Sequence, residues 1–313
     1  DYKFTLGNDT SFYFLDPNII GLKTLSAFQK RYLKYSSGYG VWPRVVGTKN
    51  EKELFDKINP FLYQCRAEDC LDLPEQLYET RTVELEGEQK KVYDTVRDYF
   101  VKELDGGGRI EAVNVLARLS KLHQIAGGFV YLPSEDGRVS REFKENAKSD
   151  ALKELCEEIS FPVVVFCAFQ HEVDVVEKVF TGEGKTVGKL TAYMNDIESN
   201  KVVDKFNSGS LDVLTAHPET GGIGLNLQAM CHTMVYYSNT FSLKHRAHSE
   251  KRIHRAGQKE KCLYIDLVAK DTVDNNVYLR LQEKEDFSEW VTKKMREPGM
   301  TMEKLFEGEE NGN

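Results

Sequence analysis

Apolar runs and helical periodicities alternate at short intervals from about Ser149 onward. The run PVVVFC at 162–167 is continuously apolar and rich in β-branched residues, as in a parallel strand buried on both faces. The segment HEVDVVEKVF at 171–180 has the spacing of an amphipathic helix. Repeated β-α units of this kind predict an α/β fold with a right-handed, doubly wound parallel sheet. Further strands are predicted at 186–191, 211–216, 233–238 and 262–269, and further helices at about 198–206 and 273–285.

The first half of the chain has a different pattern, dominated by helical spacing. Gly, Pro and Asn residues interrupt it, and one strand is predicted, TRTVELE at 80–86. We therefore expect a helical accessory region N-terminal to the sheet. The predicted helices lie at 23–35, 51–63, 86–104 and 109–128.

The bulk composition is that of an ordinary globular protein, with 40% hydrophobic and 29% charged residues. No apolar run is long enough to span a membrane. The chain begins DYKFTL, without an initiator Met or a secretory pattern, so we expect a fragment or a processed product. Cys65 and Cys70 have no second pair at ligand spacing, and no metal site is expected. Irregular cysteine spacing favours a reducing, intracellular compartment; the others are Cys156, Cys167, Cys231 and Cys262.

Charge is unevenly distributed along the chain. The net charge of −8 argues against a nucleic-acid footprint over the whole surface. The segment from Lys244 to Lys261, however, contains seven Lys or Arg and three His but only two acidic residues, Glu250 and Glu260. We expect any nucleic acid to be bound through a focused strip rather than through a whole basic face.

The stretch from Ala216 to Gln258 carries the most chemistry. Its first part, AHPETGGIGLNLQ, is a glycine loop after a predicted strand. Its last part, HSEKRIHRAGQ, is predicted to be a helix with Arg252 and Arg255 on one face. Guanidinium forks presented in this way suit a transferring phosphoryl group, whose negative charge must be neutralised. Because ligands of doubly wound sheets gather at the carboxyl ends of the strands, both elements are expected there. The alternative is a solvated basic face.

A second glycine-rich segment, TGEGKT at 181–186, matches the core of a phosphate-binding loop. Such a loop follows a strand and opens a helix, so that phosphates meet the helix N-terminus. Here a predicted helix precedes the segment and a predicted strand follows it, and Val179 stands where the first Gly belongs. We interpret TGEGKT as a helix-to-strand turn.

The segments GGIGLNLQ at 221–228 and RIHRAGQ at 252–258 resemble the fifth and sixth motifs of Swi/Snf-type ATPases in helicase superfamily 2. This chain departs from many relatives in having TFSLKH at 240–245 instead of Trp-Asn-Pro, and His248 instead of a glutamine. These departures resemble the compact bacterial and phage branch. Other segments are similar in the same order, at 14–21, 28–32, 60–75, 86–93, 120–129, 146–155, 162–174 and 266–278.

The resemblance implies a motor of two RecA-like lobes that binds ATP with Mg²⁺ between them, held mainly by an N-terminal lobe that this chain lacks. This chain would supply the second lobe, with Arg252 and Arg255 as catalytic arginine fingers. A structural cap is the alternative for His217, Thr220 and Asn226, which could also contact a phosphate backbone. The nucleotide contacts implied are Gly221, Gly222, Gly224, Asn226 and Gln258, and the nucleic-acid contacts are Phe169, Gln170, His217 and Thr220.

Four regions are expected: a helical segment at 1–75, connecting helices at 76–147, the RecA-like C-terminal lobe at 148–290 and a tail at 291–313. The expected function is that of an ATP-dependent, DNA-stimulated helicase or translocase that is inactive without its N-terminal lobe. Its expected partners are that lobe and DNA or RNA, and its expected location is the cytoplasm, or the nucleus of a eukaryote. The alternatives are a non-catalytic nucleic-acid- or protein-binding module with a degenerate lobe, and an RNA helicase.

Overall fold

A computed structural model describes residues 17–22, 24–35, 45–61, 71–105, 112–134, 137–220, 225–297 and 305. The chain divides into two compact units, Asp1–Leu71 and Asp72–Asn313.

The described part of the first unit is mostly helical. Its core packs Phe28 and Tyr32 against Leu54 and Ile58. The helix predicted at 23–35 ends at Tyr32, because the chain then turns into a short strand that pairs with 45–48. The elements are α2 (Pro17–Ile20), α3 (Leu25–Tyr32), β1 (Leu33–Tyr35), β2 (Val45–Thr48), α4 (Glu51–Ile58) and the 3₁₀ helix η1 (Asn59–Phe61).

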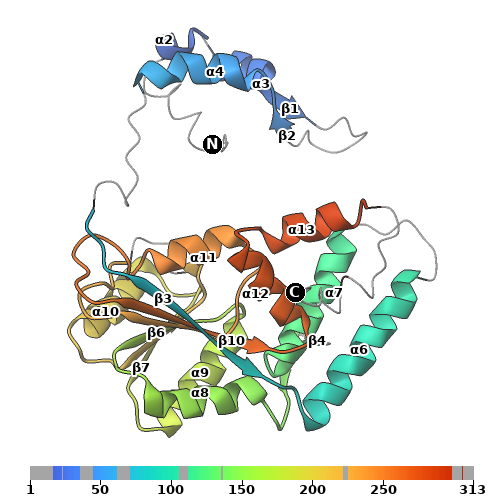
Figure 1. Cartoon of the computed structure of the whole chain (residues 1–313), viewed down its shortest axis with the longest axis vertical. Coiled ribbons are helices and arrows are strands. Elements are labelled where there is room, and N and C mark those ends of the chain that lie inside the picture. Colours follow the sequence, from blue (N-terminus) through green and yellow to red (C-terminus); the bar gives the residue numbers. More distant parts are fainter. Residues whose placement is uncertain are drawn as a thin grey trace. The chain divides into compact units, whose positions relative to one another are not determined.

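The second unit is built on a six-stranded parallel sheet with the order β3-β10-β9-β6-β8-β7 (Figure 1). The α/β fold predicted from the sequence is therefore confirmed. The strand predicted at 80–86 joins this sheet, because β3 pairs with β10 over its whole length. The strands are β3 (Gln76–Val83), β6 (Val163–Phe166), β7 (Val187–Leu190), β8 (Val213–Ala216), β9 (Thr233–Tyr236) and β10 (Cys262–Ala269).

Both faces of the sheet are buried, which explains the continuous apolar runs. Val163 and Val165 of β6 face one hydrophobic cluster, whereas Val164 and Phe166 face another. The first cluster is covered by α8 (Ala147–Glu158) and α9 (Gln170–Gly182), and the second by α10 (Asp196–Asn207). The remaining helices of this unit that the structure describes are α6 (Gly87–Asp105), α7 (Ala112–Ala126), α11 (Leu243–Glu250), α12 (Val273–Gln282) and α13 (Phe287–Lys294).

A hairpin of two strands, β4 (Phe129–Ser134) and β5 (Gly137–Glu142), follows α7. The sequence analysis did not predict it. The reason is that the apolar residues of this region end with β4, while β5 consists mainly of exposed polar residues.

The connecting helices share a core with the sheet unit. Side chains of α6 and α7 pack against α12 and α13 in one hydrophobic cluster. Beside this cluster, the ammonium of Lys148 lies 2.7 Å from Asp274, and His123 lies 3.1 Å from the same carboxyl group. Both members of the Lys148–Asp274 pair are almost fully buried, at 0% and 2% exposed. Burial alone would raise the pKa of Asp274, but the charge of Lys148 and the His123 hydrogen bond outweigh it and lower that pKa to about 2.

Replacing Lys148 by Met should lower the free energy of unfolding by about 3–5 kcal/mol, because Asp274 would remain charged and buried without its main partner. The matched control is Lys261→Met, which breaks an exposed pair with Glu75 and should cost less than about 1 kcal/mol. Urea denaturation of both variants measures the difference. Equal losses for the two variants would contradict this account of the buried pair.

Candidate functional site

Arg252 and Arg255 lie in a tight turn, not in the predicted helix. The α-helix α11 ends at Glu250, and the next amides form short-range bonds from Arg252 N to Ser249 O (2.9 Å) and from Ile253 N to Glu250 O (3.3 Å). Gly257 then adopts a left-handed conformation (φ +95°), which an α-helix cannot contain. The prediction of a helix through this segment was wrong because it relied on residue spacing alone.

The two guanidinium groups are held close together without a carboxylate partner among the residues that the structure describes. Arg255 donates from Nη1 to the side-chain oxygen of Asn226, and the carbonyl of Arg252 accepts from Leu227 N at 3.2 Å. Burial lowers the pKa of Arg252, and the charge of Arg255 lowers it further. Because two like charges repel each other, their neighbourhood favours an anion.

Gln258 shapes this turn with its own side chain. Its amide nitrogen donates to Cys231 O (3.0 Å) and Ile253 O (3.2 Å), while its carbonyl oxygen accepts from the amides of Lys259 (2.9 Å) and Glu260 (3.0 Å). The side chain is buried, so it acts on a ligand only through the turn that it holds.

The arginine turn lies towards the amino ends of the strands. His254 bonds to Pro74 O at 2.9 Å, just before β3, and Gln258 reaches Cys231, just before β9. The expectation that the arginines lie at the carboxyl ends is therefore corrected, since the chain runs back along α11 before reaching them. Asn226 lies beside the turn, whereas the predicted contacts Gly221, Gly222 and Gly224 fall outside the described residues.

Arg246 belongs to the basic strip seen in the sequence, yet it is a structural residue. It is 7% exposed, lies 2.5 Å from Asp266 and 2.6 Å from Glu250, and stacks on Tyr236 at 3.7 Å from the ring centroid. Asn239 joins the same cluster through a 2.7 Å bond to Asp266. This cluster anchors α11 to the sheet and thereby fixes the start of the arginine turn.

All four predicted nucleic-acid contacts line one pocket at the carboxyl ends of the strands. Its volume is about 520 Å³. Phe169 and Gln170 follow β6, and His217 and Thr220 follow β8. Residues after β7 and one residue of β4 complete it; the further lining residues are Tyr131, Ala168, Thr191, Ala192, Met194, Ser199 and Glu219.

Sequence reasoning missed the contributions from β4 and from the loop after β7. Thr191 could have been found, because it follows a predicted strand just as His217 does. Tyr131 could not, since it lies on the hairpin that had no clear sequence pattern.

Phe169 is fixed from behind by a buried carboxylate. Its amide donates to Glu172 at 3.1 Å, and the Ser238 hydroxyl donates to the same carboxyl group. Burial raises the pKa of Glu172. The Phe169 ring packs edge-on against His123 at 5.2 Å. Burial, and then the neighbouring His245, lower the pKa of His217, which favours its neutral form.

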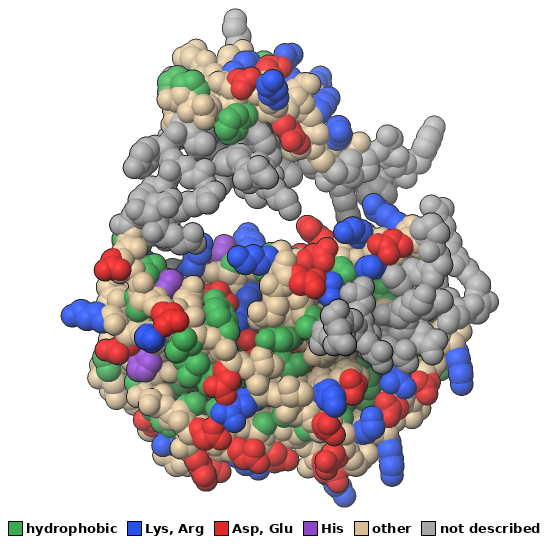
Figure 2. All heavy atoms as spheres, viewed as in Figure 1, with side chains coloured by type: hydrophobic (Ala, Val, Ile, Leu, Met, Phe, Trp, Pro, Cys, Tyr) green, Lys and Arg blue, Asp and Glu red, His purple; other side chains and the backbone are tan. Residues whose placement is uncertain are grey.

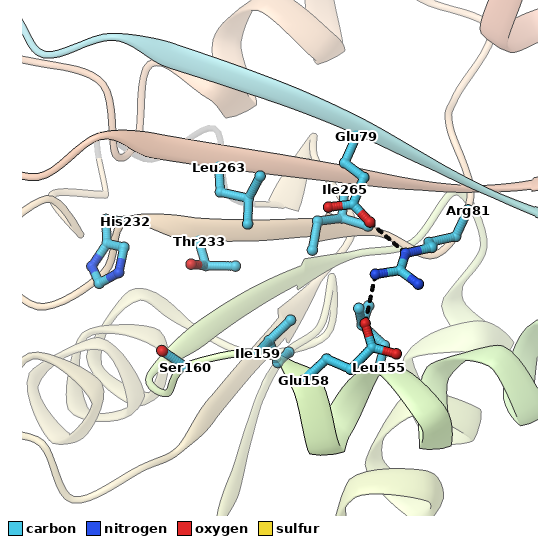
Figure 3. A pocket seen from close by; sticks show the side chains of 10 residues that line it. All are labelled: Glu79, Arg81, Leu155, Glu158, Ile159, Ser160, His232, Thr233, Leu263 and Ile265. Carbon is cyan, nitrogen blue, oxygen red and sulfur yellow. Dashed lines mark hydrogen bonds and ion pairs between the residues drawn. The ribbon is translucent and has the colours of Figure 1, made fainter.

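A second hollow, of about 220 Å³, lies between α8 and the strands β3, β9 and β10 (Figure 3). Its cation, Arg81, bonds to Glu79 and lies 2.6 Å from Glu158, so it is already neutralised within the protein. Figure 2 likewise shows acidic and basic side chains interspersed on the visible face, without a continuous basic field. The arginine turn is therefore a better candidate for anion binding than this hollow.

Three further predictions concern sites that would bind metal or phosphate. TGEGKT does connect a helix to a strand, since α9 ends at Gly182 and β7 begins at Val187, and Thr186 bonds to the carboxylate of Asp212 at 2.7 Å. Within the described ranges, no group of three His, Cys, Asp or Glu could hold a metal ion. Cys65 and Cys70 lie outside those ranges. No described helix is long and apolar enough to cross a membrane.

Comparisons with known proteins agree with this architecture. Residues 147–257 match the model of the helicase conserved C-terminal domain. The chain is 30% identical to protein p41 of the Acyrthosiphon pisum secondary endosymbiont phage 1 over 74% of this chain and 48% of that one. It is 24% identical to an uncharacterized ATP-dependent helicase of Mycoplasma genitalium, over 72% of this chain and 22% of that one. The chain thus spans about half or less of the length of these relatives.

Solved structures share the fold at lower identity. The Sulfolobus solfataricus SWI2/SNF2 ATPase core in complex with dsDNA matches 95% of this chain and 63% of its own, with a TM-score of 0.60 and 18% identity. The C-terminal part of the Fun30 ATPase domain matches 72% of this chain and 99% of its own, with a TM-score of 0.54 and 15% identity. The chain therefore contains a helicase C-terminal domain at 147–257, has the RecA-like fold of the Swi2/Snf2 ATPase structures, and resembles the Swi/Snf-type helicases of superfamily 2.

Proposed function

We propose that this chain is the C-terminal motor lobe of an ATP-dependent, DNA-stimulated helicase or translocase, with Arg252 and Arg255 as its arginine fingers. The observation that carries the proposal is the neighbourhood of these two guanidinium groups, which have no carboxylate partner in the described part of the chain. A cleft completed by another lobe would bring an anion to them. ATP with Mg²⁺ would supply the phosphoryl group transferred there, and the N-terminal lobe of the two-lobed protein would mainly hold it.

The residues around the turn fit this role. Asn226 holds the Arg255 fork through one nitrogen and leaves the others free to donate. Gln258 fixes the backbone of the turn, so the guanidinium groups need little reorganisation when an anion arrives. Contacts of Gly221, Gly222 and Gly224 with the nucleotide remain part of the proposal.

The carboxyl-edge pocket is the proposed nucleic-acid contact, through Phe169, Gln170, His217 and Thr220. DNA is the proposed track, because a structural neighbour with the same fold was solved with dsDNA. The two proposed sites lie at different ends of the strands, so nucleotide and nucleic acid would not compete for one surface.

Replacing Arg255 by Ala in the two-lobed protein should lower DNA-stimulated ATP hydrolysis by about 10³-fold or more, because the transferring phosphoryl charge would lose its fork. Lys at the same position should not rescue the rate, since an ammonium lacks the planar geometry. Steady-state phosphate release measures both variants. Lys153→Ala, an exposed change on α8 outside the basic strip, is the matched control and should keep the wild-type rate. A nearly normal rate for Arg255→Ala would remove the arginine-finger assignment.

ATP hydrolysis by the two-lobed protein should rise with duplex or single-stranded DNA, and rise less with RNA. The 313-residue chain alone should hydrolyse no ATP with any of the three. Phosphate release with each nucleic acid measures this. Stronger stimulation by RNA would identify an RNA helicase, whereas no hydrolysis by the two-lobed protein would favour a non-catalytic binding module.

A further inference from the structure

The carboxyl-edge pocket is poorly suited to a phosphate group. Among the described residues no Lys or Arg lines it, and the one charged side chain in that lining is the carboxylate of Glu219. Proteins bind nucleic-acid phosphates with Arg and Lys as well as with hydroxyl and amide side chains and backbone amides, and the described lining offers only the uncharged donors. Burial lowers the pKa of His217, which favours its neutral form. The electrostatics of the pocket therefore favour a neutral ligand.

Two large aromatic side chains form part of the pocket wall. Phe169 and Tyr131 both line it, and Phe129 packs edge-on against each of them at 5.6 Å and 5.0 Å. Aromatic rings fixed in this way offer flat surfaces on which a planar ligand can stack.

Polar side chains in the same pocket have no partner in the described part of the protein. Their hydroxyl and amide groups can both donate and accept hydrogen bonds. An edge of a planar, polar ligand would satisfy them. These side chains belong to Gln170, Thr191, Ser199 and Thr220.

A highly exposed aromatic residue lies within the segment of the chain that lines the pocket. Tyr193 is 91% exposed, between the lining residues Ala192 and Met194. Its ring is accessible to a ligand from solvent, and Tyr is among the side chains enriched at binding surfaces.

We propose that this pocket receives an unpaired nucleobase, which stacks on Tyr193 at the rim and hydrogen-bonds to the polar lining. The volume of about 520 Å³ falls in the range of small-molecule sites and leaves room for one base with its sugar outside. The inference rests on the proposed function, because it specifies how the nucleic acid contacts this lobe: through a base of a single strand or of a locally unpaired site.

The test compares two short single-stranded DNA oligonucleotides, one with 2-aminopurine at its centre and one with an abasic site there. Binding to the 313-residue chain is followed by fluorescence anisotropy, and stacking by quenching of 2-aminopurine. Tyr193→Ala should weaken binding of the first oligonucleotide about fivefold or more and relieve its quenching, and Gln170→Ala should weaken it less. Neither change should alter binding of the abasic oligonucleotide.

Two controls separate stacking from a general loss of surface. Tyr193→Trp should keep affinity and quenching, and Ile197→Ala, 69% exposed on α10 and outside the lining, should leave both unchanged. Equal losses on both oligonucleotides, or no quenching with the wild-type chain, would overturn the base pocket while leaving the motor function intact. Failure of the chain to bind either oligonucleotide would overturn the pocket as well. Failure of the motor function itself is read separately, from ATP hydrolysis by the two-lobed protein.

Discussion

The charge of Lys148 can be buried only because Asp274 lies 2.7 Å away. Their partners tie together parts of the chain that are distant in sequence, since His123 lies on α7 and Lys148 also donates to Tyr237 O at 2.8 Å. Apolar side chains can shift slightly and stay in contact, whereas a buried charge is stabilised only while its partner of opposite charge stays in place. The connecting helices and the sheet are thereby held in one arrangement, on which the position of Phe169 depends, because its ring packs on His123.

That arrangement separates two kinds of chemistry. The arginine turn reaches the amino side of the sheet through Gln258 and Cys231, and Arg252 and Arg255 have no carboxylate partner there among the described residues. The pocket lies at the carboxyl ends, with aromatic walls and neutral polar groups. One end thus suits an anion and the other a planar neutral ligand, a division that follows from which side chains each strand end exposes rather than from the fold alone.

The strongly periodic segments of the sequence predict the sheet well. Local irregularities of the backbone cannot be predicted from periodicity. Strand β10 is found at 262–269 as predicted, because burial on both faces demands a continuous apolar run. The spacing of Arg252 and Arg255 fits a helix equally well, but the short-range bonds after Glu250 and the left-handed Gly257 cannot be inferred from spacing. The predicted contacts after β6 and β8 meet in one pocket because parallel strands end at one edge. Tyr131 reaches that pocket only through tertiary packing of an exposed hairpin.

Two adjacent residues just after β9, Ser238 and Asn239, connect to the pocket and to the arginine turn respectively. The Ser238 hydroxyl donates to Glu172, which in turn accepts from the amide of Phe169 beside the pocket. The next residue, Asn239, donates to Asp266, which holds Arg246 and with it the helix that leads into the arginine turn. Buried hydrogen bonds of this kind have fixed partners, so the two neighbouring side chains cannot shift independently of the elements that they hold. The exit of β9 therefore provides a continuous polar connection between the pocket and α11.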